Sequence, residues 1–399
     1  MEWDVIVIGA GPAGCFTAMQ IVPSGFKVLI IEEHQEIGWP VQCAGLISPR
    51  TLELSGVDKS VIINNLTGLR VFSPLSARLQ VESSSALALA INRLTFDREL
   101  AVKAENAGAV VQRGLRVNGI ERISGGYRLT AAGKNKMNVT MDTKLLIGAD
   151  GANSKVARWL QLNHDNPKAV MFAADAELQC ADTGLISIFL GQNLAPGWFG
   201  WIIPLDAKTC RVGTGFALVQ PKCSPQRYFQ QLVNHYPQIF KDLKIIRYTG
   251  GTVPLGLMPK IYSSHAMLVG DAACHTKPIS GGGLYMGLRG AQICGQIAVE
   301  ALSEGDLSET KMSHYQNLWE KDLGEEIISA MTHRQSFLDC SDEDIELVIR
   351  FLSKPLCQKL ILKYGDIDYP SHLAKKLFSP WKNNFLKVAL RIADYVHLM

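Results

Sequence analysis

Gly9-Ala10-Gly11-Pro12-Ala13-Gly14 stands between the apolar run Val5-Ile6-Val7-Ile8 and a helix-like stretch from Ala13 to Ile21. A second apolar run, Val28-Leu29-Ile30-Ile31, ends at Glu32. The glycines permit a tight turn and let a pyrophosphate approach the backbone N–H groups at a helix N-terminus. Glu32, about 20 residues downstream, is placed to accept hydrogen bonds from ribose hydroxyls. The stretch therefore predicts a strand, turn, helix and strand that bind a dinucleotide.

Two further anchors lie far along the chain. Asp150-Gly151 ends a stretch that starts with Leu145-Leu146-Ile147, and Gly270-Asp271 follows Met267-Leu268-Val269. An ordinary turn would explain Asp150-Gly151 alone. The later segment Pro278-Ile279-Ser280-Gly281-Gly282-Gly283 presents N–H groups at the start of a helix, which suits partial negative charge; a purely structural helix start is the alternative. One anchor indicates a dinucleotide, whereas the three together indicate FAD, with Asp271 on its ribityl chain.

The composition is that of a folded protein without a nucleic-acid partner. A chain of 399 residues, 47% hydrophobic and 19% charged, can bury a large core in two or three domains. Its formal net charge of +3 is too small, and its basic residues too dispersed, for nucleic-acid binding. No apolar run reaches the ~18 residues of a spanning helix, and the acidic start Met1-Glu2-Trp3-Asp4 is unlike a signal peptide. We expect a cytoplasmic protein, with peripheral membrane contact left open.

The cysteines indicate neither a metal site nor a disulfide framework. There are nine, an odd number, at irregular spacings and without a C-x-x-C pair. Most are expected to be small buried hydrophobic residues in a reduced compartment.

Strand-like and helix-like segments alternate in a pattern that predicts an α/β fold. Residues 1–50 are expected to form a strand, a helix and a strand, and Leu94–Gly108 a helix. Short apolar runs with turn signals predict strands in 109–150 and 166–259, and long helices follow from Gly282. The simplest arrangement that joins the three anchors is a discontinuous Rossmann-like FAD-binding domain of residues 1–70, 91–165 and 260–310, an inserted antiparallel β-sheet substrate domain of residues 71–90 and 166–259, and a helical C-terminal region of residues 311–399.

Together with Arg93-x-x-x-Asp97-x-x-Leu100, the three anchors resemble the p-hydroxybenzoate hydroxylase-type FAD flavoproteins, whose FAD-binding domain is of the glutathione reductase type. Within that superfamily, the chain is most similar to the geranylgeranyl reductases, including the archaeal digeranylgeranylglycerophospholipid reductases. The resemblance runs through essentially the whole chain and includes Pro40–Leu46, Pro196–Pro204, the stretch from Tyr315 to Glu325, and Gly365–Pro370.

The resemblance implies FAD-dependent reduction of isolated C=C bonds in geranylgeranyl chains of archaeal-type membrane lipids or prenyl diphosphates. Such alkenes have no conjugated carbonyl to accept hydride, so protonation and hydride delivery must be coupled. An apolar wall suits the isoprenoid chain, because each buried CH₂ gains about 0.8 kcal/mol. Since no second dinucleotide fingerprint is present, the external electron donor stays open between NAD(P)H, ferredoxin and another donor protein.

Cys43 is the catalytic residue that the resemblance implies, in a loop beside the isoalloxazine ring. It would shape the reactive pocket or assist proton delivery; a small packing residue is the alternative. Phe199 and Trp201 would line the substrate cavity. The family usually has Tyr-x-Trp-x-Phe-Pro there, and this chain keeps Trp201 and Pro204 but has Phe199 and Ile203, which leaves the exact substrate open. The residues expected to bind FAD are Gly9, Gly11, Ala13, Gly14, Glu32, Glu33, Cys43, Ala44, Gly45, Arg93, Val117, Asp271, Gly281, Gly282, Gly283 and Leu284.

Two other functions fit the same anchors. One is a monooxygenase or halogenase of the same superfamily; Trp198-x-x-Trp201-Ile202-Ile203-Pro204 resembles the halogenase motif Trp-x-Trp-x-Ile-Pro loosely. The other is an electron-transfer flavoprotein that reduces a quinone, although such relatives usually need a cysteine cluster that this sequence lacks. Residues 380–393 mix apolar and basic side chains at helical spacing, which suits a helix on an anionic lipid surface or one packed on its own domain.

Overall fold

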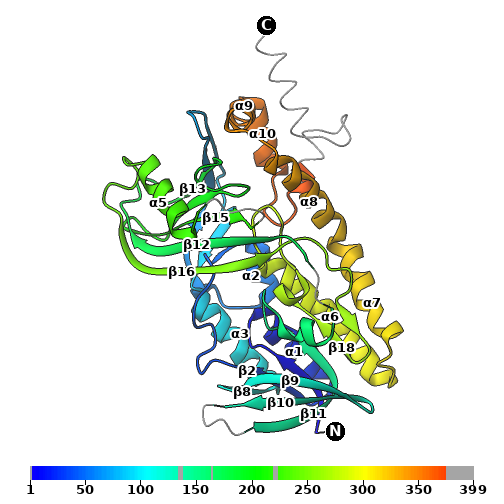
Figure 1. Ribbon diagram of the computed structural model, residues 1–399. Helices are drawn as coiled ribbons and strands as arrows, with labels where there is room; N and C mark the ends of the chain where they lie inside the picture. Colours follow the sequence, from blue (N-terminus) through cyan, green and yellow to red (C-terminus); the bar gives the residue numbers. More distant parts are fainter. Residues whose placement is uncertain (1, 134–137, 163–164, 219–222, 374–399) are drawn as a thin grey trace.

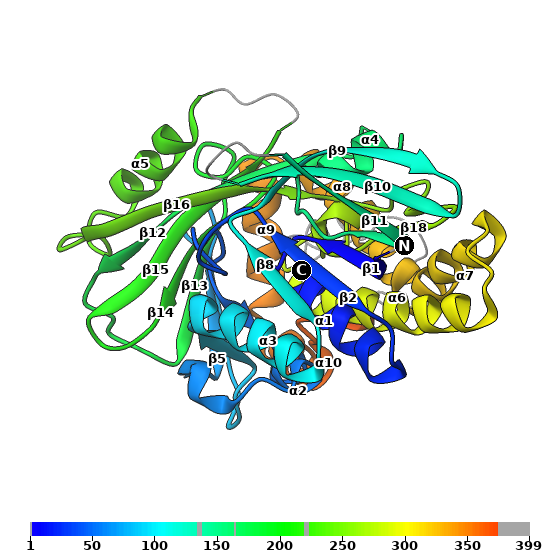
Figure 2. The ribbon, with the colours of Figure 1, turned by 90° about the horizontal axis from the view of Figure 1, so that it is seen from below.

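The chain forms two parts, each centred on a β-sheet, with long helices along one side (Figure 1). The computed structural model describes residues 2–133, 138–162, 165–218 and 223–373. A largely parallel sheet with its helices forms the lower part in Figure 1, and a seven-stranded, mostly antiparallel sheet forms the upper part. The same two parts lie side by side when the molecule is seen from below (Figure 2). The predicted α/β architecture with a second sheet is confirmed.

The parallel sheet holds the N-terminal motif at its centre. β1 (Trp3–Ile8) pairs in parallel with β2 (Val28–Glu32) on one side and with β11 (Asn138–Gly148) on the other. Strands that are buried on both faces need continuous apolar runs, and Val5 to Val7 are fully buried. The first helix, α1 (Pro12–Ile21), leaves the end of β1 through the glycine turn and packs against α6 and α3.

The seven-stranded sheet has the order β16-β12-β15-β14-β13-β5-β6. Neighbouring strands are antiparallel except β13 and β5, which are parallel. Residues 68–72 and 78–82 form β5 and β6, so this sheet includes residues on both sides of the boundary that we expected at residue 70. The strand-like stretch 166–259 also contains a helix that the sequence pattern did not indicate. This helix, α5 (Pro225–His235), begins after the capping side chain of Ser224 and packs on β15 and β12.

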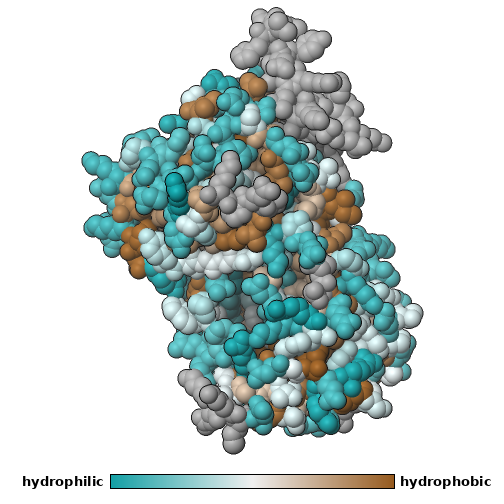
Figure 3. All heavy atoms as spheres, viewed as in Figure 1, coloured by the Kyte–Doolittle hydropathy of each residue, from teal (hydrophilic) through white to brown (hydrophobic). Residues whose placement is uncertain are grey.

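Among the described residues after 283, helices dominate from α6 (Leu284–Glu304) to α10 (Pro355–Tyr364), as predicted for this part of the chain. α7 (Glu309–Trp319) and α8 (Glu325–Leu338) run along the right side of Figure 1, from the parallel-sheet part towards the upper part. The predicted amphipathic segment 380–393 lies outside the described residues. Of the helices that the structure describes, none has the length and apolar character needed to cross a membrane. On the face seen in Figure 3, hydrophobic residues form separate groups among hydrophilic ones.

The elements have the following bounds. The strands are β1 Trp3–Ile8, β2 Val28–Glu32, β3 Leu46–Ile47, β4 Ile62–Leu66, β5 Gly68–Phe72, β6 Arg78–Glu82, β7 Ala88–Ile91, β8 Val110–Arg113, β9 Arg116–Ile123, β10 Gly126–Ala132, β11 Asn138–Gly148, β12 Lys168–Glu177, β13 Leu185–Phe189, β14 Gly200–Pro204, β15 Thr209–Ala217, β16 Lys244–Pro254, β17 Tyr262–Ser263 and β18 Ala266–Leu268. The helices are α1 Pro12–Ile21, α2 Pro49–Ser55, α3 Arg93–Ala107, α4 Lys155–Trp159, α5 Pro225–His235, α6 Leu284–Glu304, α7 Glu309–Trp319, α8 Glu325–Leu338, α9 Asp342–Leu352 and α10 Pro355–Tyr364, with the short helix η3 at Gly270–Ala273.

Candidate functional site

The three anchors meet because they follow strands that are neighbours in the parallel sheet. Gly9 follows β1, Glu32 ends β2, and Asp150 and Gly270 come shortly after β11 and β18. Parallel strands end at one edge of a sheet, which is where ligands of α/β proteins bind. A cavity of about 390 Å³ opens at this edge, between the strand ends and the seven-stranded sheet.

The glycine turn is shaped for close approach of a ligand. Gly9 has φ +106°, and a Cβ there would lie 2.3 Å from the carbonyl oxygen of Ala149. A Cβ on Gly14 would lie 2.1 Å from the carbonyl oxygen of Gly9, so both glycines are required by packing behind the turn. Gly11 is different, because a Cβ there would meet nothing within 4 Å and the residue lines the cavity. This open position at the start of α1 fits a pyrophosphate against backbone N–H groups.

Glu32 lines the cavity at the end of β2. Its Oε2 accepts a hydrogen bond from Ala10 N at 3.0 Å, and its Oε1 accepts one from His34 N at 2.9 Å. Oε1 also lies 2.7 Å from His34 Nδ1. The carboxylate is thereby fixed, and the remaining acceptor site on Oε2 suits a ribose hydroxyl. Glu33 is instead half-exposed in an ion pair with Arg116, and Val117 is buried in β9; neither lines the cavity.

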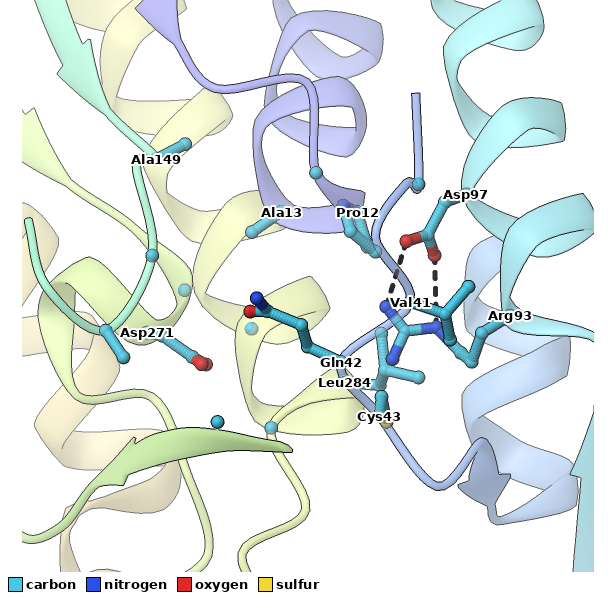
Figure 4. A pocket seen from close by; sticks show the side chains of 18 of the residues that line it. Pro12, Ala13, Val41, Gln42, Cys43, Arg93, Asp97, Ala149, Asp271 and Leu284 are labelled. Atoms are coloured by element: carbon cyan, nitrogen blue, oxygen red, sulfur yellow. Dashed lines mark hydrogen bonds and ion pairs between the residues drawn. The ribbon is translucent and has the colours of Figure 1, made fainter. Parts of the chain in front are cut away.

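Asp271 points into the cavity from η3 (Figure 4). Burial raises the pKa of its carboxyl to about 6, although the positive charge of Arg93 acts in the opposite direction. None of the residues that the structure describes donates a hydrogen bond to this carboxylate. The carboxylate is partly exposed to the cavity, and its free acceptor sites fit a ligand that brings hydroxyl groups, such as a ribityl chain.

Arg93 and Asp97 form a second charged wall of the cavity, at the start of α3. The guanidinium donates two hydrogen bonds to the carboxylate, with Nε–Oδ1 at 3.1 Å and Nη2–Oδ2 at 3.0 Å (Figure 4). The two side chains are only 12% and 10% exposed. Burial disfavours the charge on Arg93, but Asp97 outweighs this and keeps the pKa of Arg93 above its ordinary value. Burial raises the pKa of the Asp97 carboxyl, although the charge and the hydrogen bonds of Arg93 oppose this. The guanidinium of Arg93 stays charged and is held in a fixed position at the cavity wall.

The loop that carries Cys43 crosses the cavity opposite Asp271. Val41, Gln42 and Cys43 line it, and the Gln42 side chain extends towards its centre (Figure 4). The seven-stranded sheet holds this loop. Thr249 Oγ1 donates to the carbonyl of Val41 at 2.6 Å, and Arg211 Nη1 donates to the carbonyl of Ala44 at 2.8 Å.

The residues just after Cys43 support it from behind. The Cys43 thiol accepts a hydrogen bond from Gly45 N at 3.3 Å. Gly45 has φ +62°, and a Cβ there would lie 2.4 Å from Arg211 Nη1, so this position requires glycine. Ala44 and Gly45 do not line the cavity; their part is to shape the turn that presents Cys43.

The glycine-rich segment before α6 closes the far side of the cavity. Gly281, Gly283 and Leu284 line it, whereas Gly282 does not. A Cβ on Gly283 would lie 2.9 Å from Asp271 Oδ1, so the segment and Asp271 are in close contact. The start of α6 thus lies beside Asp271, and the positive end of the helix dipole there suits the negatively polarised edge of a ligand ring.

The structure does not bring Phe199 and Trp201 to this cavity. Trp201 is 5% exposed in β14. Its ring packs against Gly213, where an added Cβ would lie only 2.3 Å from Trp201 Cζ2. Both aromatic residues pack behind Met171, which does line the cavity. Their contact with a substrate stays a prediction.

Several residues that line the cavity were not among the predicted site residues. Gly38, Trp39 and Pro40 carry turn signals that could have extended the predicted loop. The Gly250-Gly251 pair inside β16 is a further signal, because glycine in a strand often marks close approach. Met171, Thr252 and Val253 give no local signal at all. The lining residues outside the predicted set are Ala10, Pro12, His34, Gly38, Trp39, Pro40, Val41, Gln42, Asp97, Ala149, Gly151, Ala152, Met171, Gly251, Thr252, Val253, Val269, Gly270, Gly287 and Leu288.

Comparisons with known proteins agree with this geometry. Residues 2–316 match the family model described as FAD binding domain. The chain is 33% identical to the digeranylgeranylglycerophospholipid reductase of Methanosarcina acetivorans over 356 residues, which is 86% of this chain and 87% of the relative.

Two solved structures have the same fold. A geranylgeranyl bacteriochlorophyll reductase-like protein from Thermoplasma acidophilum superposes with a TM-score of 0.84 and 25% identity, covering 94% of this chain and 98% of the other. The p-nitrophenol 4-monooxygenase of Pseudomonas putida superposes with a TM-score of 0.71 and 16% identity, covering 91% and 98%. At that identity, the second similarity shows the fold alone.

Proposed function

Because this chain belongs to the digeranylgeranylglycerophospholipid reductase family of FAD-dependent oxidoreductases, we propose that it reduces isolated C=C bonds in geranylgeranyl chains. Archaeal-type membrane lipids are the favoured substrates, and prenyl diphosphates are the alternative. The observation that carries the proposal is the placement of the Cys43 loop across one cavity from Asp271 and the glycine-rich segment. A relative named digeranylgeranylglycerophospholipid reductase aligns with 86% of this chain, which supports the proposal.

FAD would be held along the strand ends. Gly11 and Ala13 offer backbone N–H groups to the pyrophosphate, and Glu32 accepts from the ribose of the adenosine half. Asp271 accepts from the ribityl chain, and Arg93 adds a fixed positive charge on the opposite wall. This set would orient the reactive ring between the Cys43 loop and the segment 281–284.

FAD, when bound, supplies hydride transfer to such a substrate. The chain itself contributes position, an apolar wall and water exclusion. Met171, Leu284 and Leu288 give the cavity apolar surface near the Cys43 loop, and an isoprenoid chain gains about 0.8 kcal/mol for each CH₂ that it buries there. An isolated alkene must receive a proton as hydride arrives, so a proton donor has to lie beside it.

Cys43 is the proposed residue for this position. Its thiol lies on a loop held by Arg211 and Thr249, and its side chain lines the cavity. It either delivers the proton or shapes the space in which an ordered water does so. A lipid substrate also brings the enzyme to a membrane surface, so we propose peripheral contact there.

The direct test uses chemically reduced holoenzyme incubated without oxygen with geranylgeranyl lipids, followed by mass spectrometry. We expect products heavier by two hydrogens for each reduced bond. Unchanged lipids, together with oxygen-dependent consumption of NADPH, would point to a monooxygenase instead. A second arm with geranylgeranyl diphosphate decides between the two substrate classes.

The role of Cys43 is tested with Cys43→Ala and Cys43→Ser, and with Cys223→Ala as the control outside the cavity. A direct part in proton delivery predicts a loss of turnover of roughly 10²- to 10⁴-fold with normal FAD content, while the control stays at the wild-type rate. Turnover that is unchanged in both Cys43 variants would remove the chemical role.

A further inference from the structure

A buried ion pair joins the glycine-rich segment to residues near the C-terminal end of the described chain. Lys277 Nζ lies 3.0 Å from Asp368 Oδ1 and donates a hydrogen bond to the carbonyl of Ile367 at 2.8 Å. The side chains of Lys277 and Asp368 are 9% and 0% exposed. Neither residue lines the cavity, so the contacts described above do not account for two charges buried at this place.

Asp368 is held on its other side by the start of α2. Ser48 Oγ donates to Asp368 Oδ2 at 2.5 Å, and Arg50 Nη1 lies 3.7 Å from the same oxygen. Arg50 also pairs with Asp366, whose carboxylate accepts from Asp368 N at 2.8 Å. The carboxylate of Asp368 therefore has one fixed orientation, with Lys277 on one oxygen and Ser48 on the other.

Lys277 in turn lies under the glycine-rich segment. Its N–H donates to the carbonyl of Gly282 at 3.1 Å, and its carbonyl accepts from Gly281 N at 2.8 Å. A Cβ on Gly282 would lie 2.7 Å from Lys277 Cε, so the lysine stem packs directly against the back of the segment. The front of the same segment, at Gly281 and Gly283, is cavity wall.

We propose that Lys277 and Asp368 are positioning residues that hold the segment 277–283 in the shape in which it meets the flavin ring. The inference rests on the proposed function, since that function places the ring against Gly281 and Gly283. The stretch 366–371 then connects the C-terminal helices to the flavin site. Its further contacts agree, because Tyr369 Oη lies 2.9 Å from the Oη of Tyr285 in the first turn of α6.

Because the two residues have opposite charges, their removal should change the reduction potential in opposite directions, which the loss of packing alone would not do. The intact pair adds no net charge behind the flavin segment, but either member alone would leave an unbalanced charge in a place where water screens poorly. Arg50 and Asp366 form a second pair beside it, so the four charges sum to zero. Without Lys277 the group carries one net negative charge, which disfavours the extra electrons of a reduced flavin. Without Asp368 it carries one net positive charge, which favours them. Removing one partner should therefore shift the reduction potential one way, and removing the other should shift it the opposite way.

The test measures the reduction potential and the FAD dissociation constant of the purified holoenzyme. We expect Lys277→Met to lower the potential and Asp368→Asn to raise it, with FAD binding roughly tenfold weaker in each. The double variant K277M/D368N, which restores neutrality, should return the potential towards the wild-type value. The exposed pair of Lys260 and Glu309 provides the matched control, K260M/E309Q, which should change neither quantity.

Shifts of the same sign in both single variants, or no shift in either, would overturn the inference. If a single variant does not retain FAD, the reduction potential of the double variant decides the question. A potential equal to that of the wild type supports the inference, and a potential that differs from it contradicts the inference. Failure of the proposed function is a separate result. A wild-type enzyme that leaves geranylgeranyl lipids unchanged would refute that function without altering the opposite potential shifts.

Discussion

Replacing Asp271 with asparagine separates the stability of the flavin-free protein from its affinity for FAD. Burial raises the pKa of the Asp271 carboxyl from 3.8 to about 6, and Arg93 opposes this only in part. Asparagine has nearly the same shape but no charge. We therefore expect D271N to stabilise the flavin-free protein at neutral pH and to weaken FAD binding.

The sign follows from the direction of the pKa shift. Below about pH 4 the carboxyl is protonated in the folded and unfolded chains alike, so it costs no stability. The cost develops as pH rises from about 4 to 6 and is complete above that, because the folded state then holds a poorly solvated charge. A rise from 3.8 to about 6 corresponds to about 3 kcal/mol for a fully buried group. Since Asp271 is partly exposed to the cavity, we expect about 1–2 kcal/mol.

The assay is urea unfolding of flavin-free wild type, D271N and the control D242N between pH 4 and pH 8; Asp242 is exposed. The free energy of unfolding of D271N relative to wild type should rise by about 1–2 kcal/mol over this range, and that of D242N should stay flat. The FAD dissociation constant of D271N should be roughly tenfold higher, because one acceptor oxygen becomes an NH₂ donor and the other loses its charge. A stability difference that does not change with pH would refute the raised pKa, and unchanged FAD affinity would refute the contact with the ribityl chain.

Two further predictions concern backbone packing and acid stability. Gly14→Ala places a Cβ 2.1 Å from the carbonyl oxygen of Gly9 and should strongly destabilise the protein. Gly11→Ala places a Cβ that meets nothing within 4 Å, so this variant should keep wild-type stability in urea but lose affinity for FAD. Equal stability of the two variants would contradict this reasoning. Burial raises the pKa of Glu346, but hydrogen bonds from Ser73 and the following turn outweigh it and lower the pKa to about 2. This stabilisation is present above about pH 4.5 and is lost as pH falls towards 2, so wild type should lose up to about 3 kcal/mol relative to E346Q over that interval; parallel acid-unfolding curves would refute it.

Local patterns were sufficient for the elements whose burial is continuous. The apolar runs at 5–8 and 28–31 fall within β1 and β2, and the helix expected at 94–108 is α3, displaced by one residue. Helix α5 was missed because short apolar runs on either side suggested strands. Its signal was nonetheless present, since Ser224 before Pro225 is a favourable capping pair at a helix start.

The residues of the site also differ in how well local sequence predicts them. Gly11, Glu32 and Asp271 could be predicted because each stands at a fixed distance from a buried strand. Glu33 and Val117 rest on the family resemblance and not on a motif of their own, and their contact with FAD stays a prediction. Met171 and Val253 could not be found, because their place depends on how β12 and β16 pair: Met171 lies opposite Gly251 in that register.

The two walls of the cavity are therefore built by different sheets, which helps to explain how one fold can catalyse several reactions. The wall of strand ends follows from parallel pairing around β1, which brings the glycine turn and Glu32 to one edge of the sheet. The opposite wall, with the Cys43 loop, depends on Thr249 and Arg211, which belong to the seven-stranded sheet. Substitutions in that sheet can move the reactive end without disturbing the pyrophosphate turn. Cofactor identity can thus be predicted from short motifs, whereas the substrate depends on the packing of strands remote in sequence.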